Sequence, residues 1–264
     1  MDVAKVYFVG AGPGNPDLLT IRAMKVIQQA DVVIYADSLV NPEVCSFAKE
    51  DARIVGSSSL TLEEISELMI ASVREGKTVA RLHTGDPAIY GAVFEQMALL
   101  ESSGIPFEVV PGVSSVFAAC AALGVELTVP DLTQTVIITR IEGRTPVPAG
   151  ERLRGLAEHQ ASLVLFLSAA LIDNVVAELS AGGYPLETPV AVAQRISWPD
   201  ERILRGTLSD IAGKVKAAGI NRQALIMVGE ALAQDLRQRH EEYRSKLYDK
   251  DFPHGYRGVS GENS

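Results

Sequence analysis

The sequence of 264 residues contains only two cysteines, Cys45 and Cys120. Two cysteines so far apart do not make the disulfide framework of a small secreted domain, so both are expected to be reduced structural residues of a cytoplasmic protein. The chain opens on a strand-like run, without a basic segment and cleavage site. Its longest apolar run, residues 116–125, is about half of what a membrane span requires. No membrane partner is therefore expected.

An excess of positive charge and a local metal-binding motif are also missing. The formal net charge is −9, whereas a nucleic-acid-binding surface must be basic, so no nucleic-acid partner is expected. None of the four histidines lies three to five residues from another histidine or a cysteine, so no protein-bound metal is predicted. Aromatic residues make up only 6%, and the cores must be built mainly from Val, Ile, Leu and Ala.

Strand and helix patterns alternate along the first 112 residues. Short apolar runs predict strands over residues 3–9, 30–35, 78–82 and 107–110, and amphipathic runs predict helices over 18–29, 61–75 and 90–103. Thr61 and Glu64 have the spacing of a capping box. This alternation predicts an α/β fold whose N-terminal domain, residues 1–112, has a mostly parallel sheet covered on both faces.

A second domain is predicted over residues 113–233, beginning with a helix-rich segment. Its predicted strands cover residues 135–139, 163–167, 190–193, 202–204 and 224–228, and its helices 152–159, 172–180 and 208–218. The Trp198-Pro199-Asp200 turn between two strands predicts a hairpin, so this sheet is expected to be mixed. Residues 234–264 carry six basic and six acidic residues and are expected to form a solvated helix and a loose end.

Three glycine-bearing loops follow predicted strands of the N-terminal domain. They read GAGPGNPD from Gly10, HTGDP from His83 and PGVSS from Pro111. The carboxyl ends of parallel strands lie along one edge of a sheet, so the three loops are expected to converge there. This edge is the predicted ligand-binding crevice.

The first loop matches only part of the dinucleotide-binding fingerprint. Gly10 and Gly12 fit its start, but Asn15 replaces the third glycine and Pro13 removes an N–H donor. No acidic residue stands clearly at the expected spacing, so a nicotinamide or flavin cofactor is disfavoured. A tight strand-to-helix turn without a ligand is the simpler alternative.

Other residues of these loops also have purely structural interpretations. Asp86, followed by Pro87, has the pattern of a helix N-cap and first turn. Ser114 and Ser115 could cap the next helix, although a helix start also suits a carboxylate or a ribose hydroxyl. Tyr90 could cover a ligand or belong to the core.

Arg81, Arg140 and Arg144 are the candidates for binding an acidic substrate. Arg140 follows a predicted strand, and Arg144 lies in the loop EGRTP. Arginine binds a carboxylate through two parallel hydrogen bonds, and an acidic protein needs a local basic cluster to hold an anionic ligand. A solvated loop is the alternative.

The loop sequences together resemble the tetrapyrrole (corrin/porphyrin) methylase family. GAGPGNPDLLT, HTGDPAIYG and VVPGVSSVFAA carry the general resemblance. YADSLV and PDLTQTVIITRIEGRTP are similar to the members that methylate C11 of precorrin-4 or cobalt-precorrin-4. The similarity runs over residues 5–229, and SKLYDKDFPHGYR in the tail also resembles that subgroup.

This resemblance implies two αβα domains, with S-adenosylmethionine in the cleft between them, and a homodimer. It implies methyl transfer to C11 of the corrin precursor in cobalamin biosynthesis. The implied cofactor contacts are Pro13, Gly85, Asp86, Ile89, Tyr90, Ser114, Ser115, Phe166, Leu167, Arg195, Ile196, Ala224 and Leu225. Arg195 and Ile196 lie in the local sequence QRIS, which departs from common relatives.

Methyl transfer from a sulfonium requires few catalytic groups. The leaving group is part of S-adenosylmethionine, and the main requirement is in-line alignment of carbon, methyl and sulfur. Asp37, in YADSLV, and His83 are the candidates for a catalytic polar role, although Asp37 could be only a turn residue. A family member of different ring-carbon specificity and a non-catalytic ligand-binding protein of this fold are the alternatives.

Overall fold

The computed structural model describes residues 3–248 and 252. Within it the chain divides into two units. Unit 1 contains the residues up to Ala122 together with Gln194–Arg202, and unit 2 contains Leu123–Ala193 and the chain from Ile203 onward. The chain therefore leaves unit 2 after Ala193, contributes a short segment to unit 1 and returns to unit 2.

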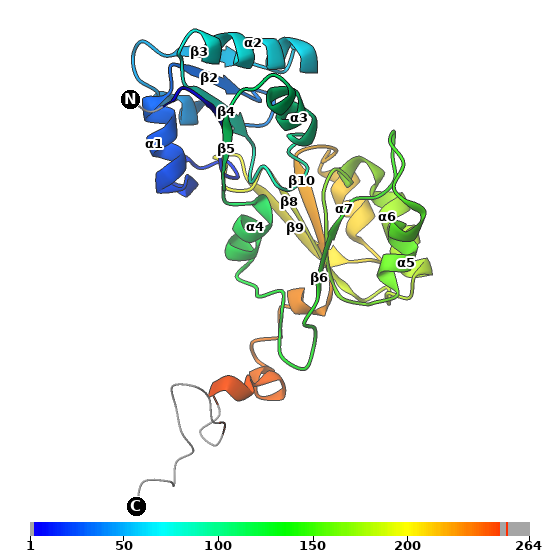
Figure 1. Ribbon diagram of the computed structural model, residues 1–264. Helices are drawn as coiled ribbons and strands as arrows, with labels where there is room; N and C mark the ends of the chain where they lie inside the picture. Colours follow the sequence, from blue (N-terminus) through cyan, green and yellow to red (C-terminus); the bar gives the residue numbers. More distant parts are fainter. Residues whose placement is uncertain (1–2, 249–251, 253–264) are drawn as a thin grey trace, which may run out of the picture. The chain divides into compact units, whose positions relative to one another are not determined.

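Unit 1 is built on a parallel five-stranded sheet in the order β3-β2-β4-β1-β5 (Figure 1). Its strands are β1 (Val6–Gly10), β2 (Val32–Tyr35), β3 (Arg53–Gly56), β4 (Val79–His83) and β5 (Phe107–Val110). The connection after β1 leads toward the β3 edge of the sheet, whereas the connection after β4 leads toward the β5 edge, so the direction of winding reverses between β1 and β4. Ligands of such sheets bind at this reversal, outside the carboxyl ends of the strands. The glycine loops after β1 and β4 flank that point.

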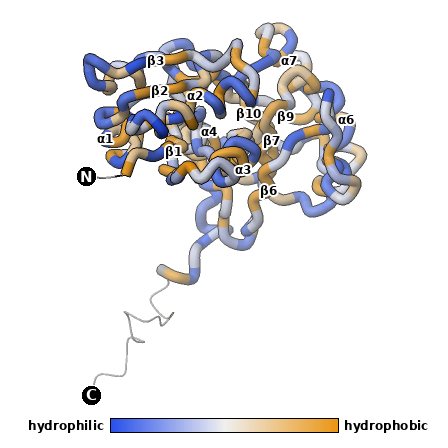
Figure 2. Tube along the Cα trace, turned by 45° about the horizontal axis from the view of Figure 1, so that its top comes forward, coloured by the Kyte–Doolittle hydropathy of each residue, from blue (hydrophilic) through white to orange (hydrophobic). Residues whose placement is uncertain are grey.

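Helices cover both faces of this sheet. They are α1 (Ile21–Gln29), α2 (Leu62–Arg74) and α3 (Phe94–Ser102), and α4 (Ser115–Leu123) follows β5. Val9 of β1 belongs to the core that α1 shares, whereas its neighbour Phe8 belongs to the core of α2 and α3. Successive strand residues point to opposite faces, so each strand supplies two cores. Figure 2 shows the hydrophobic strands and the more hydrophilic turns that connect them.

Unit 2 is built on a mixed sheet in the order β6-β7-β10-β8-β9. Its strands are β6 (Val136–Thr139), β7 (Ser162–Leu165), β8 (Pro189–Gln194), β9 (Arg202–Thr207) and β10 (Ala224–Val228), and its helices are α5 (Leu153–Ala157), α6 (Ile172–Ala181) and α7 (Ile211–Ala217). β6 and β7 run parallel, whereas β7 and β10 run antiparallel. The three helices share one core with the sheet, where Leu163, Val192 and Ile226 are buried. The predicted α/β fold with one parallel and one mixed sheet is confirmed.

The predicted starts of two helices in unit 1 had different outcomes. The capping box of α2 is confirmed, because Glu64 N–H donates to Thr61 Oγ1 at 3.2 Å and Thr61 N–H donates to the Glu64 carboxylate at 2.8 Å. The helix predicted from Tyr90 begins only at Phe94. Tyr90 and Ala92 have φ values of 54° and 51°, and such left-handed residues cannot continue a right-handed helix.

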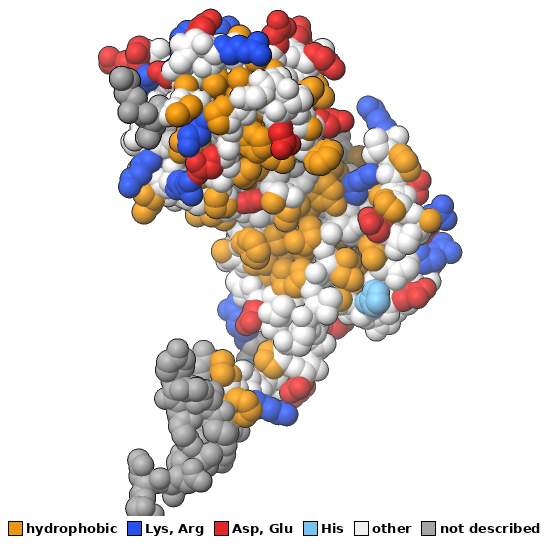
Figure 3. Space-filling model, in the orientation of Figure 1, with side chains coloured by type: hydrophobic (Ala, Val, Ile, Leu, Met, Phe, Trp, Pro, Cys, Tyr) orange, Lys and Arg blue, Asp and Glu red, His pale blue; other side chains and the backbone are white. Residues whose placement is uncertain are grey.

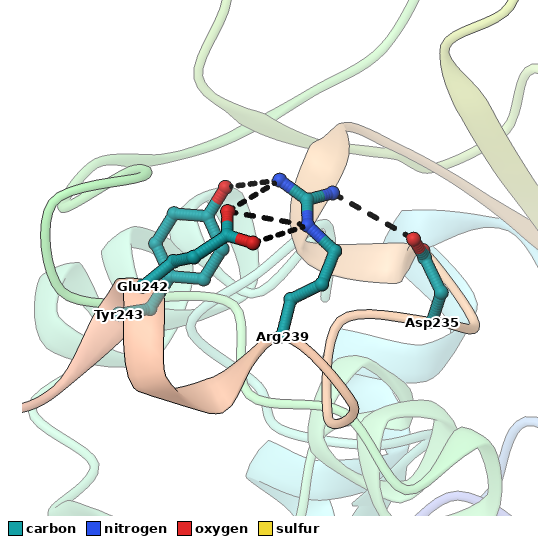
Figure 4. Close-up of polar contacts among 4 residues, drawn as sticks. All are labelled: Asp235, Arg239, Glu242 and Tyr243. Atoms are coloured by element: carbon teal, nitrogen blue, oxygen red, sulfur yellow. Dashed lines mark hydrogen bonds and ion pairs between the residues drawn. The ribbon is translucent and has the colours of Figure 1, made fainter.

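The charged tail does not form the expected α-helix within the described residues. It contains two short 3-10 helices, His240–Tyr243 and Lys246–Tyr248. The Arg239 guanidinium donates to the Glu242 carboxylate at 3.0 Å and to the Tyr243 hydroxyl at 2.6 Å, and it lies 3.7 Å from the Asp235 carboxylate (Figure 4). The expected loose end, most of SKLYDKDFPHGYR and His254 lie outside the described residues.

Further 3-10 helices connect the main elements. They cover Pro16–Leu18, Pro42–Phe47, Ala149–Glu151, Ala169–Leu171 and Glu230–Leu232. The first of them lies in the loop after β1, where Asn15 caps it by accepting from Asp17 N–H at 2.9 Å. The helix predicted from residue 18 begins only at Ile21, after this turn, and Thr20 caps it.

Candidate functional site

Three loops of unit 1 meet at the carboxyl edge of the parallel sheet: the first loop (residues 10–17), the second loop (83–91) and the third loop (111–115). Gly85 N–H donates to Gly12 O at 2.7 Å and Gly12 N–H donates to Gly85 O at 3.3 Å. A Cβ atom on Gly10 would lie 2.5 Å from the Cα atom of Gly112, and one on Gly112 would lie 2.2 Å from Gly85 O. Only glycine permits this approach. The predicted convergence of the three loops is confirmed.

The Asp86 side chain joins the second loop to the third by hydrogen bonds. One oxygen of its carboxylate accepts from Ala88 N–H at 2.8 Å, and the other accepts from Gly112 N–H at 2.8 Å. The predicted role of Asp86 as a helix N-cap is wrong, because α3 starts only at Phe94, and Asp86 caps a single isolated turn instead. The same side chain also fixes the spacing of the two loops.

The end of the second loop is conformationally strained. Tyr90 and Ala92 lie in the left-handed region, and a Cβ atom on Gly91 would lie 2.3 Å from Pro87 O. Each left-handed residue other than glycine costs about 1–3 kcal/mol and persists only where surrounding contacts enforce it. The Tyr90 side chain is 46% exposed and so does not belong to the core. Strain of this kind is typical of ligand-binding loops.

A buried polar cluster lies on β4, below the strained turn. The Arg81 guanidinium donates to Ser57 Oγ at 2.9 Å and to Gln96 Oε1 at 3.3 Å, and Gln96 Nε2 donates to Ala92 O at 2.9 Å. Arg81 is only 5% exposed, and burial lowers its pKa to about 10. The structure thus places Arg81 in the interior of unit 1, where it supports the second loop and is withdrawn from its surface.

His83 ends β4 beside this cluster and is 4% exposed. Burial, and secondarily the charge of Arg81, lower the pKa of His83 to about 3, while a hydrogen bond with the backbone of Gly91 opposes that shift. The ring is therefore neutral near pH 7. A neutral, enclosed imidazole is poorly placed to exchange protons with a substrate, and its buried Nε2 atom has no hydrogen-bond partner among the described residues.

Asp37, by contrast, is exposed at the carboxyl end of β2. Its carboxylate accepts from Ser58 Oγ at 2.6 Å and from Ser58 N–H at 2.7 Å, and these hydrogen bonds lower the pKa of Asp37. A Cβ atom on Gly56 would lie 2.9 Å from Asp37 Cγ, so glycine is needed beside it. Asp37 is thus a fixed, ionised acceptor at the same edge of the sheet as the loops.

The third loop leads into α4 through its two serines. Ser114 is 5% exposed, and its hydroxyl accepts from Val116 N–H at 3.3 Å. Ser114 therefore acts as the helix N-cap, as the structural alternative predicted, and Ser115 is the first helical residue. A Cβ atom on Gly85 would lie 3.6 Å from Ser114 Cα, so this helix start borders the second loop.

Arg195 and Ile196 belong to the segment Gln194–Arg202, which unit 1 includes. Ile196 is buried, and the Arg195 guanidinium lies 3.9 Å from the centre of the Trp198 ring. This segment contacts the first loop through Ser197 and Trp198. The sequence predicted a hairpin turn here, and the family resemblance implied cofactor contacts at Arg195 and Ile196, but neither indicated the contact of Ser197 and Trp198 with the first loop. The one available signal was that Trp198 is the single tryptophan of the chain.

The candidate residues of unit 2 lie on or directly after two paired strands, β7 and β10. β7 and β10 pair Leu165 with Ile226 in antiparallel register. Phe166 and Leu167 directly follow the end of β7, and Ala224 and Leu225 precede Ile226 on β10. Leu167 is 72% exposed and has a φ of 54°. The paired strands β7 and β10 thus bring these sequence-distant residues to the same end of the strand pair.

Arg140 and Arg144 follow β6, the parallel neighbour of β7. The Arg140 guanidinium donates to Pro146 O at 2.7 Å and to Thr145 O at 3.1 Å, so it organises its own loop. Arg144 lies exposed in that loop. Both arginines thus lie in the segment that follows β6. Arg140 organises the loop, whereas the guanidinium of Arg144 has no described role in the loop's structure.

Among the described residues, no group of three or more His, Cys, Asp or Glu side chains is arranged to hold a metal ion. Within the same part of the chain, no helix combines the length and the apolar character that crossing a membrane requires.

Comparison with known proteins adds independent information. Residues 5–212 match the family described as Tetrapyrrole (Corrin/Porphyrin) Methylases. The cobalt-precorrin-4 C(11)-methyltransferase of Methanocaldococcus jannaschii is 56% identical over 253 residues, which cover 96% of each chain. The X-ray structure of a cobalt precorrin-4 methyltransferase from cobalamin biosynthesis superimposes with a TM-score of 0.85 at 51% identity, covering 87% of this chain and 96% of that one. Uroporphyrin-III C-methyl transferase from Thermus thermophilus, complexed with S-adenyl homocysteine, gives a TM-score of 0.73 at 31% identity, covering 87% and 99%.

Proposed function

The chain belongs to the tetrapyrrole (corrin/porphyrin) methylase family, and from this premise we propose that it transfers a methyl group from S-adenosylmethionine to C11 of cobalt-precorrin-4 in cobalamin biosynthesis. The observation that carries the proposal is the 56% identity, over 96% of both chains, to a cobalt-precorrin-4 C(11)-methyltransferase. The motifs YADSLV and LTQTVIITRIEGRTP, which are similar to that subgroup, support the same assignment.

We propose the edge formed by the three glycine loops as the S-adenosylmethionine site of unit 1. The three loops contain aspartates but no lysine or arginine, and His83 among them is neutral. This charge balance suits a sulfonium cation and disfavours the pyrophosphate of a dinucleotide. The complexed S-adenyl homocysteine in the Thermus thermophilus relative supports a cofactor of this class.

The proposed contacts in unit 1 are backbone-rich. They are Pro13, Gly85, Asp86, Ile89, Tyr90, Ser114, Ser115, Arg195 and Ile196. Asp86 holds the second and third loops at a fixed spacing, and the buried cluster on β4 holds Tyr90 in its strained conformation. The cofactor contacts that the family resemblance implies within unit 2, at Phe166, Leu167, Ala224 and Leu225, stay a prediction. The proposed contacts of unit 1 bind and orient, and none has to change its protonation state.

The bound cofactor would supply an electrophilic methyl group on a sulfonium that is already a good leaving group. The protein then has to align that methyl group with the substrate carbon and exclude competing nucleophiles, and such positioning can lower a barrier by up to roughly 7–11 kcal/mol. Asp37, ionised and held by Ser58, is proposed to orient the macrocycle. Its lowered pKa makes it a weak base, so proton removal is a secondary role for this residue.

We propose that Arg140 and Arg144 contribute to binding the acidic macrocycle. Both side chains are positively charged, whereas the chain as a whole has a net charge of −9. The hydrogen bonds of Arg140 within its loop leave its charge in place while fixing the position of Arg144. Electrostatic attraction to carboxylates requires the charge, and the fixed loop reduces the entropy lost on binding.

We also propose a homodimer. α4 is apolar on nearly all its faces, and its Phe117 side chain is 65% exposed. Figure 3 shows hydrophobic side chains on the surface over this helix. An exposed apolar helix face of this kind favours association with a second copy of the chain. Light scattering coupled to size-exclusion chromatography measures the mass directly, and a monomer at micromolar concentration would remove this part of the proposal.

The decisive experiment supplies methyl-labelled S-adenosylmethionine together with cobalt-precorrin-4 or metal-free precorrin-4. Mass spectrometry counts the methyl groups transferred, and NMR locates the labelled carbon. The proposal predicts one methyl group, attached to C11, with cobalt-precorrin-4 as the better substrate. A label on another ring carbon would indicate a different family specificity. Binding of S-adenosylhomocysteine without transfer to any supplied tetrapyrrole would instead indicate a non-catalytic protein.

A further inference from the structure

Trp198 lies against the first glycine loop although 185 positions separate it from Pro13. Its indole Nε1–H donates to Pro13 O at 3.0 Å. Its ring covers Gly14, because a Cβ atom on that glycine would lie 2.2 Å from Trp198 Cδ1. Trp198 is only partly buried and is not among the core residues of unit 1. Its contacts are therefore directed at the loop and do not simply fill the interior.

The neighbouring positions of the first loop are fixed as well. Asn15 N–H donates to Ser197 Oγ at 3.0 Å, and the buried side chain of Asn41 donates through Nδ2 to Gly14 O at 2.9 Å. Three consecutive residues, from Pro13 to Asn15, thus each have a backbone group bonded to a side chain from elsewhere in unit 1. A loop with three glycines would otherwise be unusually flexible.

The turn that carries Trp198 is itself rigid. Arg195 and Ser197 have φ values of 47° and 65°, so both lie in the left-handed region. The Arg195 guanidinium lies over the Trp198 ring and donates to the Asp200 carboxylate at 2.7 Å, and Ser197 N–H donates to the Glu201 carboxylate at 2.7 Å. The cation–π contact and these charge-assisted hydrogen bonds offset the strain and fix the direction of the indole.

We propose that Trp198 is a positioning residue that holds the first glycine loop in the conformation that binds the methyl donor. This inference rests on the proposed function, which places the cofactor at Pro13. Binding then does not have to order a flexible loop, and the entropy saved appears as affinity for the cofactor. Trp198 touches the loop and not the reacting atoms, so it affects cofactor affinity and leaves the transfer step itself unchanged.

The substitution Trp198→Phe keeps an aromatic ring over Gly14 and removes the N–H donor to Pro13 O. A matched control is Tyr184→Phe, which also removes one hydrogen bond to a backbone carbonyl, that of Ala161, but within unit 2. A single hydrogen bond of this kind corresponds to an affinity change of about fivefold. Calorimetry with S-adenosylhomocysteine should therefore give a Kd about fivefold higher for W198F and unchanged for Y184F.

Steady-state kinetics should give the same division. W198F should raise the KM for S-adenosylmethionine, with little change in kcat at saturating cofactor or in the KM for the tetrapyrrole. Equal cofactor affinity in W198F and Y184F would overturn the positioning role, as would a W198F defect confined to kcat. If W198F does not fold, Ser197→Ala, which removes the acceptor for Asn15 N–H, must show the same selective loss of cofactor affinity.

The wild-type protein separates this inference from the proposed function. Trp198 is the only tryptophan of the chain, so the intrinsic emission reports on its contact with the first loop. S-adenosylhomocysteine should shift or quench that emission in the wild-type protein. If the wild type binds no S-adenosylhomocysteine at all, the proposed cofactor is wrong. If it binds with full affinity while the emission and the W198F affinity stay unchanged, only the positioning role of Trp198 is wrong.

Discussion

Replacing His83 by Asn should make unit 1 less sensitive to acid. Asn keeps a polar side chain at this position but does not titrate. In the native protein burial lowers the pKa of His83 to about 3, whereas an unfolded histidine titrates near its ordinary value of 6.5. Between those values the unfolded chain binds a proton that the folded chain does not, so stability is complete above pH 6.5 and falls as the pH decreases.

The expected loss follows from the difference between the two pKa values. Each pH unit below 6.5 lowers the free energy of unfolding by about 1.4 kcal/mol, until the folded value near 3 is reached. Between pH 8 and pH 5 the His83 contribution to stability should therefore fall by about 2 kcal/mol. The carboxylates with lowered pKa values lose their contributions as the pH falls below the ordinary values, which are 3.8 for aspartate and 4.5 for glutamate; they are Asp31, Asp37, Glu75, Asp200 and Asp210. This pH window thus isolates the histidine.

Urea unfolding followed by tryptophan emission measures the effect, since the single tryptophan, Trp198, lies in unit 1. The wild type should lose about 2 kcal/mol between pH 8 and pH 5, and H83N should lose much less. His159, an exposed histidine of unit 2, provides the control, and H159N should follow the wild type. An H83N slope equal to that of the wild type would refute the argument that burial keeps the His83 imidazole neutral in the folded protein.

Three further variants test other parts of the account. Gly112→Ala would place a Cβ atom 2.2 Å from a backbone oxygen of the second loop. It should lower the affinity for S-adenosylhomocysteine at least tenfold in calorimetry and lower stability by about 1–3 kcal/mol in thermal unfolding. The control Gly150→Ala, whose added Cβ atom would have no other atom within 4 Å, should change neither quantity. The double variant Arg140→Ala, Arg144→Ala should weaken tetrapyrrole binding by titration calorimetry and leave S-adenosylhomocysteine binding intact; equal loss of both would count against the substrate assignment. Thr61→Ala removes the cap of α2 and should cost about 1 kcal/mol in urea unfolding, and an unchanged midpoint would mean that the capping box is not stabilising.

The parts of the fold that the sequence predicted depend on local patterns. β5 and β10 agree with their predicted ranges to the residue, because both are short apolar runs with clear boundaries. The capping box of α2 follows from two residues three positions apart. The meeting of the three glycine loops was also predictable, since parallel strands necessarily bring their carboxyl ends to one edge.

The remaining features depend on contacts that no local pattern encodes. β3 is an exposed edge strand of unit 1, with too few apolar residues to be recognised. The sequence suggested that Arg81 is a surface residue that binds a ligand. Its burial is explained by the packing of α3 over β4. The bond from Trp198 to Pro13 joins distant segments, and the late start of α3 results from the left-handed conformation of Tyr90. Long-range contacts and strain therefore determine the finer geometry of the candidate site.

A crystal structure of the protein with S-adenosylhomocysteine tests the central claim most directly. The account predicts density for the ligand in contact with the backbone at Pro13, at Gly85 and at the start of α4, with the Trp198 indole still bonded to the first loop. Density for S-adenosylhomocysteine at any other place, with these three loops untouched, would contradict it.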